Sequence, residues 1–208
     1  MKNTLLGAAS ALFLMTGAAL AAPADQPGHM SPKPGSNTEA MSAVKDSTAG
    51  MVGQVSAEMT STTQGFVTAA ATSDLYEVTA GKLAAERAQS PDVKAFAQKM
   101  VQAHTATTAK LKGIIAGNNI NVAAPAHVDN RRQGMLDNLR GAKAEDFDHR
   151  YISQQIAAHK EADILFSGYA KSGDNAAIKD FAATTDKDIK MHLSMAQHLD
   201  AATKSASK

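Results

Sequence analysis

The sequence predicts an all-α protein, a bundle of four long helices in which one connection is a long crossover. Along four segments between residues 65 and 203, apolar residues recur at steps of three and four, which is the period of a helix face. No segment shows the alternation of apolar and polar residues that is typical of a half-buried strand. The three breaks between these segments are short, long and short in turn, and this order of connections predicts the bundle.

The first two helices meet at a clear boundary. Apolar and small residues follow a helical period from Phe66 to Ala84. Ser90-Pro91-Asp92 then ends one helix and begins the next, because Ser caps helix N-termini, Pro fits the first helical position and an acid is favourable in the first turn. Gly117-Asn118-Asn119 ends the second helix. The tight link predicts that these two helices are antiparallel.

The second pair of helices follows a long crossover, residues 118–141, in which we expect a short helix over residues 129–139. The third long helix begins near Glu145 and ends at Lys171-Ser172-Gly173, where Gly is expected to take a left-handed cap. Asp174 is expected to cap the fourth helix, because Asp is a favoured N-cap residue.

The N-terminus predicts export. Residues 1–21 combine a positive Lys2, an apolar run and the small-x-small pattern Ala19-Leu20-Ala21, so we expect a signal peptide that is cleaved after Ala21. No other run is long enough for a membrane span, which needs roughly 20 apolar residues. The mature chain is therefore expected to be periplasmic or secreted, without a transmembrane anchor. The chain has no Cys, so burial alone must hold the fold.

Four of the six prolines lie between residues 22 and 37, a composition typical of a linker. Within residues 38–63, Met and Val at helical spacing are interrupted by two glycines, which leaves either a weak helix or a disordered lead-in. The expected organisation is a signal peptide (1–21), a flexible linker with this weak helix (22–64), a four-helix bundle domain (65–203) and a frayed C-terminus (204–208).

The charge balance limits the partners. The chain has 21 basic and 20 acidic residues, and removal of the signal peptide takes away Lys2, which leaves 20 of each. A neutral chain is not expected to bind nucleic acid or to depend on anionic lipid. An envelope protein or a second copy of the chain remains as a partner. A further hypothesis is that residues 38–63 dock on a membrane or on a partner helix.

One ionisable residue falls near the middle of each predicted helix, on or beside its apolar face: Glu77, His104, His159 and His192. Burying such a group costs several kcal/mol unless it is paired. Glu77 and His104 each lie 13 residues from the Ser90-Pro91 boundary, so they should be level. His159 is similarly level with Asp186. We therefore expect the first three residues, joined by Asp186, to form one polar layer. His192 is expected more than a turn away, beside Tyr151 or Asp148.

This pattern has two interpretations. The sequence favours a buried Glu–His network that satisfies itself and fixes helix register without a cofactor. The alternative is a metal site made by the same four residues, because imidazole and carboxylate suit iron, zinc, manganese or copper. A full di-iron centre is not expected, since Val101 and Ile189 stand three residues before His104 and His192, where such centres have carboxylates. A separate alternative is a copper site on the fourth helix, formed by Met191, His192, Met195 and His198.

Nucleophilic catalysis finds no support in the sequence. The chain has no Cys, no Gly-x-Ser-x-Gly, no His-Glu-x-x-His and no Gly-rich phosphate loop, and these are the motifs through which such chemistry is recognised. We therefore expect a non-catalytic binding or stress-related module rather than an enzyme. The alternative function is a metal-binding or redox protein.

Several short motifs resemble one family. They are Asp74-Leu75-Tyr76-Glu77, Ser90-Pro91-Asp92-Val93-Lys94, Met100-Val101 with His104, Phe147-Asp148 with Tyr151 and His159, and His192-Leu193. In these motifs the chain resembles exported bacterial proteins that are catalogued as domain of unknown function 4142 and are often labelled outer-membrane proteins. The resemblance covers residues 65–199. It implies a ferritin-like helical bundle in the bacterial envelope, with no established activity.

Overall fold

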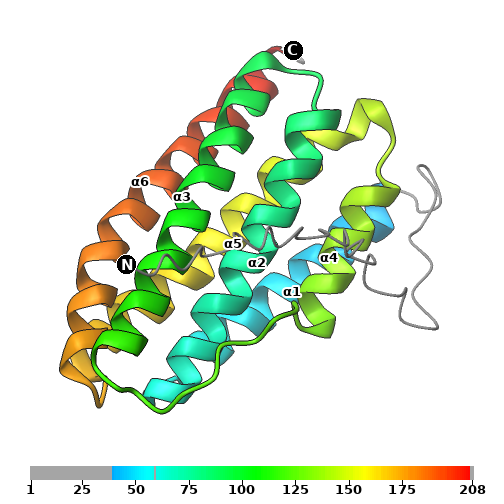
Figure 1. The fold of residues 1–208 in the computed structure, drawn as a ribbon. Coiled ribbons are helices and arrows are strands. Elements are labelled where there is room, and N and C mark those ends of the chain that lie inside the picture. The colour runs from blue at the N-terminus through cyan, green and yellow to red at the C-terminus, as the bar shows by residue number, and fades with distance from the viewer. Residues whose placement is uncertain (1–38, 59, 207–208) are drawn as a thin grey trace, which may run out of the picture. The chain divides into compact units, whose positions relative to one another are not determined.

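The computed structural model describes residues 39–58 and 60–206. These residues form helices and no strand (Figure 1), which confirms the all-α prediction: α1 (Glu39–Glu58), α2 (Thr63–Arg87), α3 (Pro91–Gly117), α4 (Asn130–Gly141), α5 (Ala144–Ser172) and α6 (Ala176–Ala206). The predicted signal peptide, residues 1–21, lies outside the described residues, as does the first part of the linker. No helix in the described part of the chain is long and apolar enough to cross a membrane.

The helices form two layers of three. In one layer α2 packs between α3 and α4, and in the other α5 packs between α6 and α1. Contacts of α3 with α6, of α2 with α5 and of α4 with α1 and α5 join the layers. The described residues thus form a helical bundle, in which α1 and α4 lie beside the four long helices. Of the two interpretations of residues 38–63, the structure has the helix, α1.

Most helix ends follow the sequence signals. The Ser90 hydroxyl accepts a hydrogen bond from the Val93 backbone amide at the start of α3. The link from α5 to α6 differs from the prediction in two ways. Asn175, not Asp174, caps α6 by accepting from the Ile178 amide at 3.1 Å. Gly173 is not left-handed, since its φ is −60°. Glycine fits there because a Cβ would overlap the Tyr169 ring.

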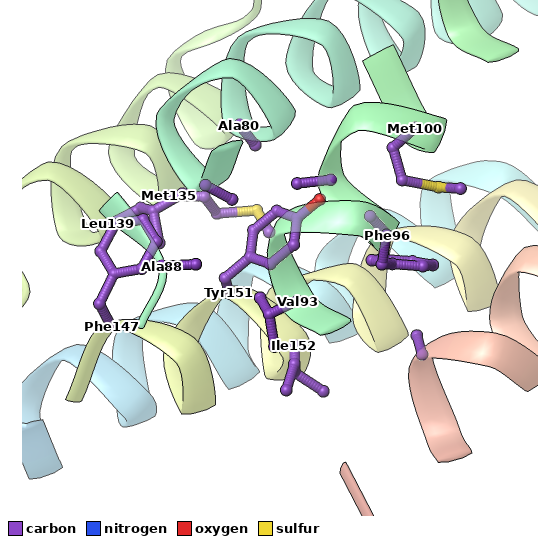
Figure 2. Packing of buried hydrophobic residues seen from close by; sticks show 14 of the residues in the cluster. Ala80, Ala88, Val93, Phe96, Met100, Met135, Leu139, Phe147, Tyr151 and Ile152 are labelled. Atoms are coloured by element: carbon purple, nitrogen blue, oxygen red, sulfur yellow. The ribbon is translucent and has the colours of Figure 1, made fainter. Parts of the chain in front are cut away.

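Two apolar clusters fill the bundle. One lies around Tyr76, Phe147 and Tyr151, and Figure 2 shows how its aromatic and aliphatic side chains interlock. The other lies around Phe66, whose ring stacks on that of Tyr169 with centroids 4.3 Å apart. Burial of this apolar surface is what holds a chain without Cys together.

The candidate residues lie where one apolar cluster gives way to the other. On α3, Met100 belongs to the first cluster and Leu111 to the second, with His104 between them. The same alternation occurs along α5 and α6. The interior is therefore apolar, then polar, then apolar along the bundle axis.

Candidate metal centre

Three histidines from three helices meet inside the bundle. They are His104 on α3, His159 on α5 and His192 on α6, and their exposed fractions are only 6%, 1% and 4%. The ring centroids lie 5.6 Å apart for His104 and His159, 5.8 Å for His104 and His192, and 5.6 Å for His159 and His192. One ring nitrogen of each histidine lies within 4.8 Å of one ring nitrogen of the other two.

Hydrogen bonds hold two of the rings by their Nδ1 atoms. His104 Nδ1 lies 2.8 Å from Asp74 Oδ1, and Asp74 Oδ2 accepts from the Thr108 hydroxyl at 2.8 Å. His159 Nδ1 lies 2.9 Å from the backbone carbonyl oxygen of Gln155. Because a carbonyl and a carboxylate only accept, both Nδ1 atoms carry the proton. Such partners orient the histidine ligands of metal ions in proteins.

Three other ring nitrogens of the cluster have no hydrogen-bond partner among the described residues. His104 Nε2, His159 Nε2 and His192 Nδ1 are buried without a hydrogen bond in the described part of the chain. Leaving a buried polar atom unsatisfied costs about 1–3 kcal/mol. In His104 and His159 the nitrogen that could supply a lone pair to an ion is therefore the one without a partner.

The electrostatics favour neutral rings at two positions. Burial, helped by the charge on His104, lowers the pKa of His159 to about 3. Burial and the neighbouring His159 and His104 lower the pKa of His192 to about 3 as well. Burial alone would also lower the pKa of His104, but its hydrogen bond to Asp74 and the charge of Glu77 raise it overall. At neutral pH His159 and His192 thus keep the lone pairs that a metal ion requires.

Glu77 lies beside the three histidines rather than among them. Its Oε1 is 3.9 Å from His159 Nδ1, and it is not one of the residues whose ligand atoms all converge within 4.8 Å. The side chain is 1% exposed, and the Gln155 side chain is the polar group near enough to act as a weak donor to it. Burial raises the pKa of Glu77, against the opposing influence of His104. A buried carboxylate at this position can balance positive charge in the cluster.

The expected position of His192 is wrong. It lies with His104 and His159, not a turn away beside Tyr151 or Asp148. Asp148 instead accepts hydrogen bonds from the backbone amides of residues 89 and 90. Asp186, which was expected in the layer, pairs with a lysine one turn along α6 at 2.5 Å and is not part of the converging group.

The error lies in the position of the turn. Because α5 ends at residue 172 and α6 begins at residue 176, the midpoint is 174. His159 lies 15 residues before it and is therefore level with Ile189 (174 + 15 = 189). Helical side chains lean toward their own N-terminus. In this antiparallel pair His159 leans away from the turn and His192 leans toward it, so the two rings meet.

The alternative copper site on α6 is divided by the fold. Met191, Met195 and His198 line a groove of about 830 Å³ between α3 and α6. His192 is instead buried inside the bundle. The four residues of the predicted copper site therefore do not line one common cavity.

Sequence reasoning missed two residues of the cluster. Asp74 holds His104, and its position three residues before Glu77 places it on the same face of α2, where it could have been found. Gln155 holds His159 through its backbone carbonyl. A backbone contact of this kind leaves no signal in residue identity.

The donor set fits a transition-metal ion. A tetrahedral ion with metal–nitrogen bonds of about 2.0–2.1 Å holds its ligand nitrogens about 3.4 Å apart. The three nitrogens, at most 4.8 Å apart, would have to close by up to about 1.4 Å, which small rotations of the rings can supply. Three imidazoles leave one coordination position open.

The family model with the description Domain of unknown function (DUF4142) matches residues 49–199. No curated protein matches the chain, and no solved structure matches it. The matched segment covers 151 of the 208 residues (199 − 48 = 151) and extends from within α1 to the last third of α6. The chain therefore belongs to the family of domain of unknown function DUF4142.

Proposed function

We propose that the protein is an exported module that binds one divalent transition-metal ion through His104, His159 and His192. The observation that carries the proposal is the convergence of three buried imidazoles whose free nitrogens have no partner in the described chain. Metal binding is the alternative function that the sequence analysis named. Export is supported by the signal-peptide pattern of residues 1–21.

The pattern of paired and unpaired ring nitrogens supports a metal site over a structural network. A network that exists only to fix helix register pairs its polar atoms with one another. In this cluster the Nδ1 atoms of His104 and His159 are paired, while both Nε2 atoms are not. One ion would satisfy these nitrogens and that of His192 together.

The charges in the cluster also fit a divalent ion. An ion of charge +2 that is bound by neutral imidazoles must be balanced inside the bundle, because an uncompensated buried charge is very costly. Asp74 and Glu77 are buried carboxylates, one bonded to His104 and the other 3.9 Å from His159. In their ionised forms they balance the ion.

The ligand type narrows the choice of ion. Imidazole binds Zn²⁺, Cu²⁺, Ni²⁺ and Fe²⁺, and the affinity of a nitrogen site rises toward Cu²⁺. The chain offers no thiolate, because it has no Cys. We therefore expect Cu²⁺ or Zn²⁺ to be held most tightly. Since all three rings are buried, the site is suited to retaining an ion rather than to receiving a large substrate.

Metal titration of the mature chain, residues 22–208, tests the proposal. The protein should be made without a histidine tag, stripped with a chelator and titrated with Zn²⁺ and with Cu²⁺ by calorimetry. We expect one ion per chain, and loss of that binding in His159→Gln and in His192→Gln. His149→Gln is the matched control, because His149 lies on α5 with its side chain 56% exposed, and it should bind as the parent does.

Circular dichroism would confirm that each variant is folded. Two results would overturn the proposal. One is a parent chain that takes up neither ion. The other is uptake that His159→Gln and His192→Gln leave unchanged while both remain folded. A parent without metal, together with a large loss of stability in both variants, would assign the cluster to a structural role.

A further inference from the structure

Helix α1 turns its apolar side chains toward solvent. Six large apolar side chains are exposed in the described part of the chain, and five of them lie on α1: Met41, Val44, Met51, Val52 and Val55. Each of the five is more than half exposed. Isolated exposed apolar residues are ordinary, whereas a continuous apolar face marks an interaction surface.

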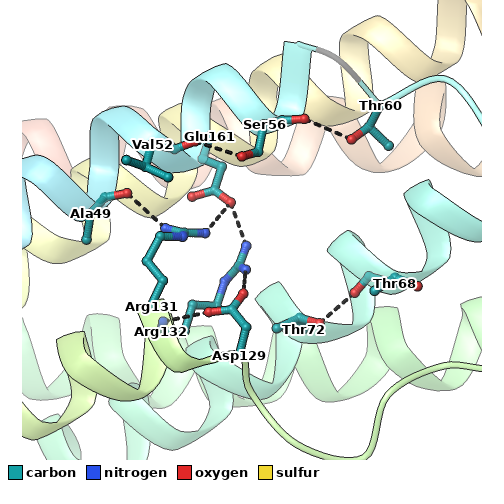
Figure 3. A network of polar contacts seen from close by, with 10 residues as sticks. All are labelled: Ala49, Val52, Ser56, Thr60, Thr68, Thr72, Asp129, Arg131, Arg132 and Glu161. Atoms are coloured by element: carbon teal, nitrogen blue, oxygen red, sulfur yellow. Dashed lines mark hydrogen bonds and ion pairs between the residues drawn. The ribbon is translucent and has the colours of Figure 1, made fainter.

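The polar contacts of α1 enforce this orientation. Its buried face consists of small and polar residues. Asp46 accepts hydrogen bonds from Asn138 at 2.9 Å and from Gln154 at 2.7 Å. Figure 3 shows Arg131 of α4 donating to the backbone carbonyl of Ala49, at 3.1 Å. Turning α1 to bury its apolar face would break these contacts, so the exposed face is a specified feature of the fold.

Small residues bring the inner side of α1 close to α5. A Cβ on Gly50 would lie 3.1 Å from Ala157 Cβ, and a Cβ on Gly53 would overlap the Glu161 carboxylate. That carboxylate is already held by two arginines of α4. The apolar face is therefore carried on a helix that is closely packed along its opposite side.

The exposed face has the spacing of a coiled-coil seam. Residues 41, 44, 48, 51, 55 and 58 are separated by three and four residues in strict alternation, which is the a and d pattern of a heptad. Four of these six positions carry Met or Val, the fifth is Thr48 and the last is Glu58. This seam lies on the outer side of the layer, since α1 packs mainly against α4 and α5.

We propose that α1 pairs with α1 of a second copy of this chain, as two antiparallel helices related by a twofold axis. An antiparallel pair places an a residue opposite a d residue. With the axis midway between residues 48 and 51, Val44 faces the partner's Val55 and Thr48 faces the partner's Met51. Val44 and the partner's Val55 then cover one another on both sides of the axis, and each Met51 lies against the partner's Thr48.

The charges favour this occupant and this orientation. Lys45 and Glu58 are the exposed charged residues of α1. In the antiparallel pair Glu58 is level with the partner's Met41, and the partner's Lys45 is one turn away, about 6 Å along the axis. A parallel pair would instead place each Glu58, a d residue of the seam, opposite the partner's Glu58. A single lysine without aromatic residues also does not resemble a helix that lies on a membrane.

Sedimentation equilibrium of residues 22–208 over a wide concentration range tests the pairing. We expect the parent to be a dimer, and we expect Val44→Glu to weaken dimer association by about 100-fold or more. The twofold axis places the new carboxylate in the interface twice, and buried carboxylates oppose association. Ala43→Glu is the matched control, since residue 43 is exposed on α1 but outside the seam. It should leave the dimer unchanged.

A charge pair then tests the orientation. Val44→Glu combined with Val55→Lys in one chain should restore the dimer, because in the antiparallel arrangement the new carboxylate at position 44 of each copy would face the new ammonium group at position 55 of the other. A parent that stays monomeric, or a dimer that Val44→Glu leaves intact, would overturn the proposal. So would sedimentation with zwitterionic vesicles by a monomeric parent, which would assign the face to a membrane.

Discussion

Gly81 sets the distance between α2 and α3, one turn from Glu77. A Cβ at this position would lie 2.8 Å from Val101 Cγ2 and 3.0 Å from the backbone carbonyl oxygen of Ala97. The valine can rotate, but the carbonyl belongs to α3 and cannot move without the helix. Gly81→Ala should therefore push the two helices apart, although alanine is the better helix former.

The size of the effect follows from two opposing terms. Replacing Gly by Ala inside a helix stabilises it by about 1 kcal/mol. Overpacking a closely fitted interface costs about 1–3 kcal/mol, and the backbone contact places Gly81→Ala in the upper part of that range. The net loss should be about 1–2 kcal/mol. For a domain of this size, that lowers the melting temperature by about 2–8 °C.

Gly113→Ala provides the control. Gly113 lies in α3, and a Cβ there would meet no atom within 4 Å, so the same chemical change should raise stability by about 0.5–1 kcal/mol. Urea unfolding of both variants, followed by circular dichroism, compares them directly. If Gly81→Ala proves as stable as Gly113→Ala, the close approach of the two helices does not determine their stability, and the reasoning fails.

Three further predictions follow from the site and from α1. In the presence of a chelator, the contribution of His159 and His192 to the free energy of unfolding should be present above about pH 6.5 and lost as the pH falls toward their folded-state pKa of about 3, because the unfolded chain then binds protons that the folded chain excludes. Urea unfolding of the parent and of the double variant to Gln, at pH 7.5 and 5.5, measures this contribution. The same pH dependence in both proteins would contradict the prediction. Asp74→Asn should weaken metal binding about 10–100-fold while the fold persists, because it removes the carboxylate that orients His104. Calorimetric titration measures the affinity, and an unchanged affinity would contradict this role for Asp74. Gly53→Ala should loosen α1, seen as faster amide hydrogen exchange in this helix alone, because the new methyl group would overlap a carboxylate of α5 that two arginines already hold; unchanged exchange would contradict this account.

The helices could be predicted because their signals are local. Ser90-Pro91 marks a boundary through capping and proline geometry, which depend on neighbouring residues alone. The period of the apolar residues then gives the length and inner face of each long helix. The candidate residues followed from the same period, since an ionisable residue on an apolar face stands out wherever the helix packs.

The register of the site could not be predicted as well, because small errors at a turn are carried along the whole helix. Placing the α5–α6 turn slightly too early moved the partner of His159 by nearly one turn, from Ile189 to Asp186. The orientation of α1 was beyond the sequence for a different reason. Its inner face is specified by Asn138 and Gln154, which lie about 90 and 110 residues away along the chain.

The arrangement of the interior bears on why the histidines are there. An apolar cluster lies on each side of the polar layer, so apolar residues at these positions would have continued the core from one cluster to the other. A partly satisfied polar layer is worse for stability than an apolar one. His104 and His159 are held firmly by Asp74 and by the Gln155 carbonyl, yet the nitrogens that they direct into the cluster remain without partners. A self-contained network would be expected to pair both nitrogens of each ring. A ring that is held through one nitrogen and unpaired at the other is what the proposed metal site would need.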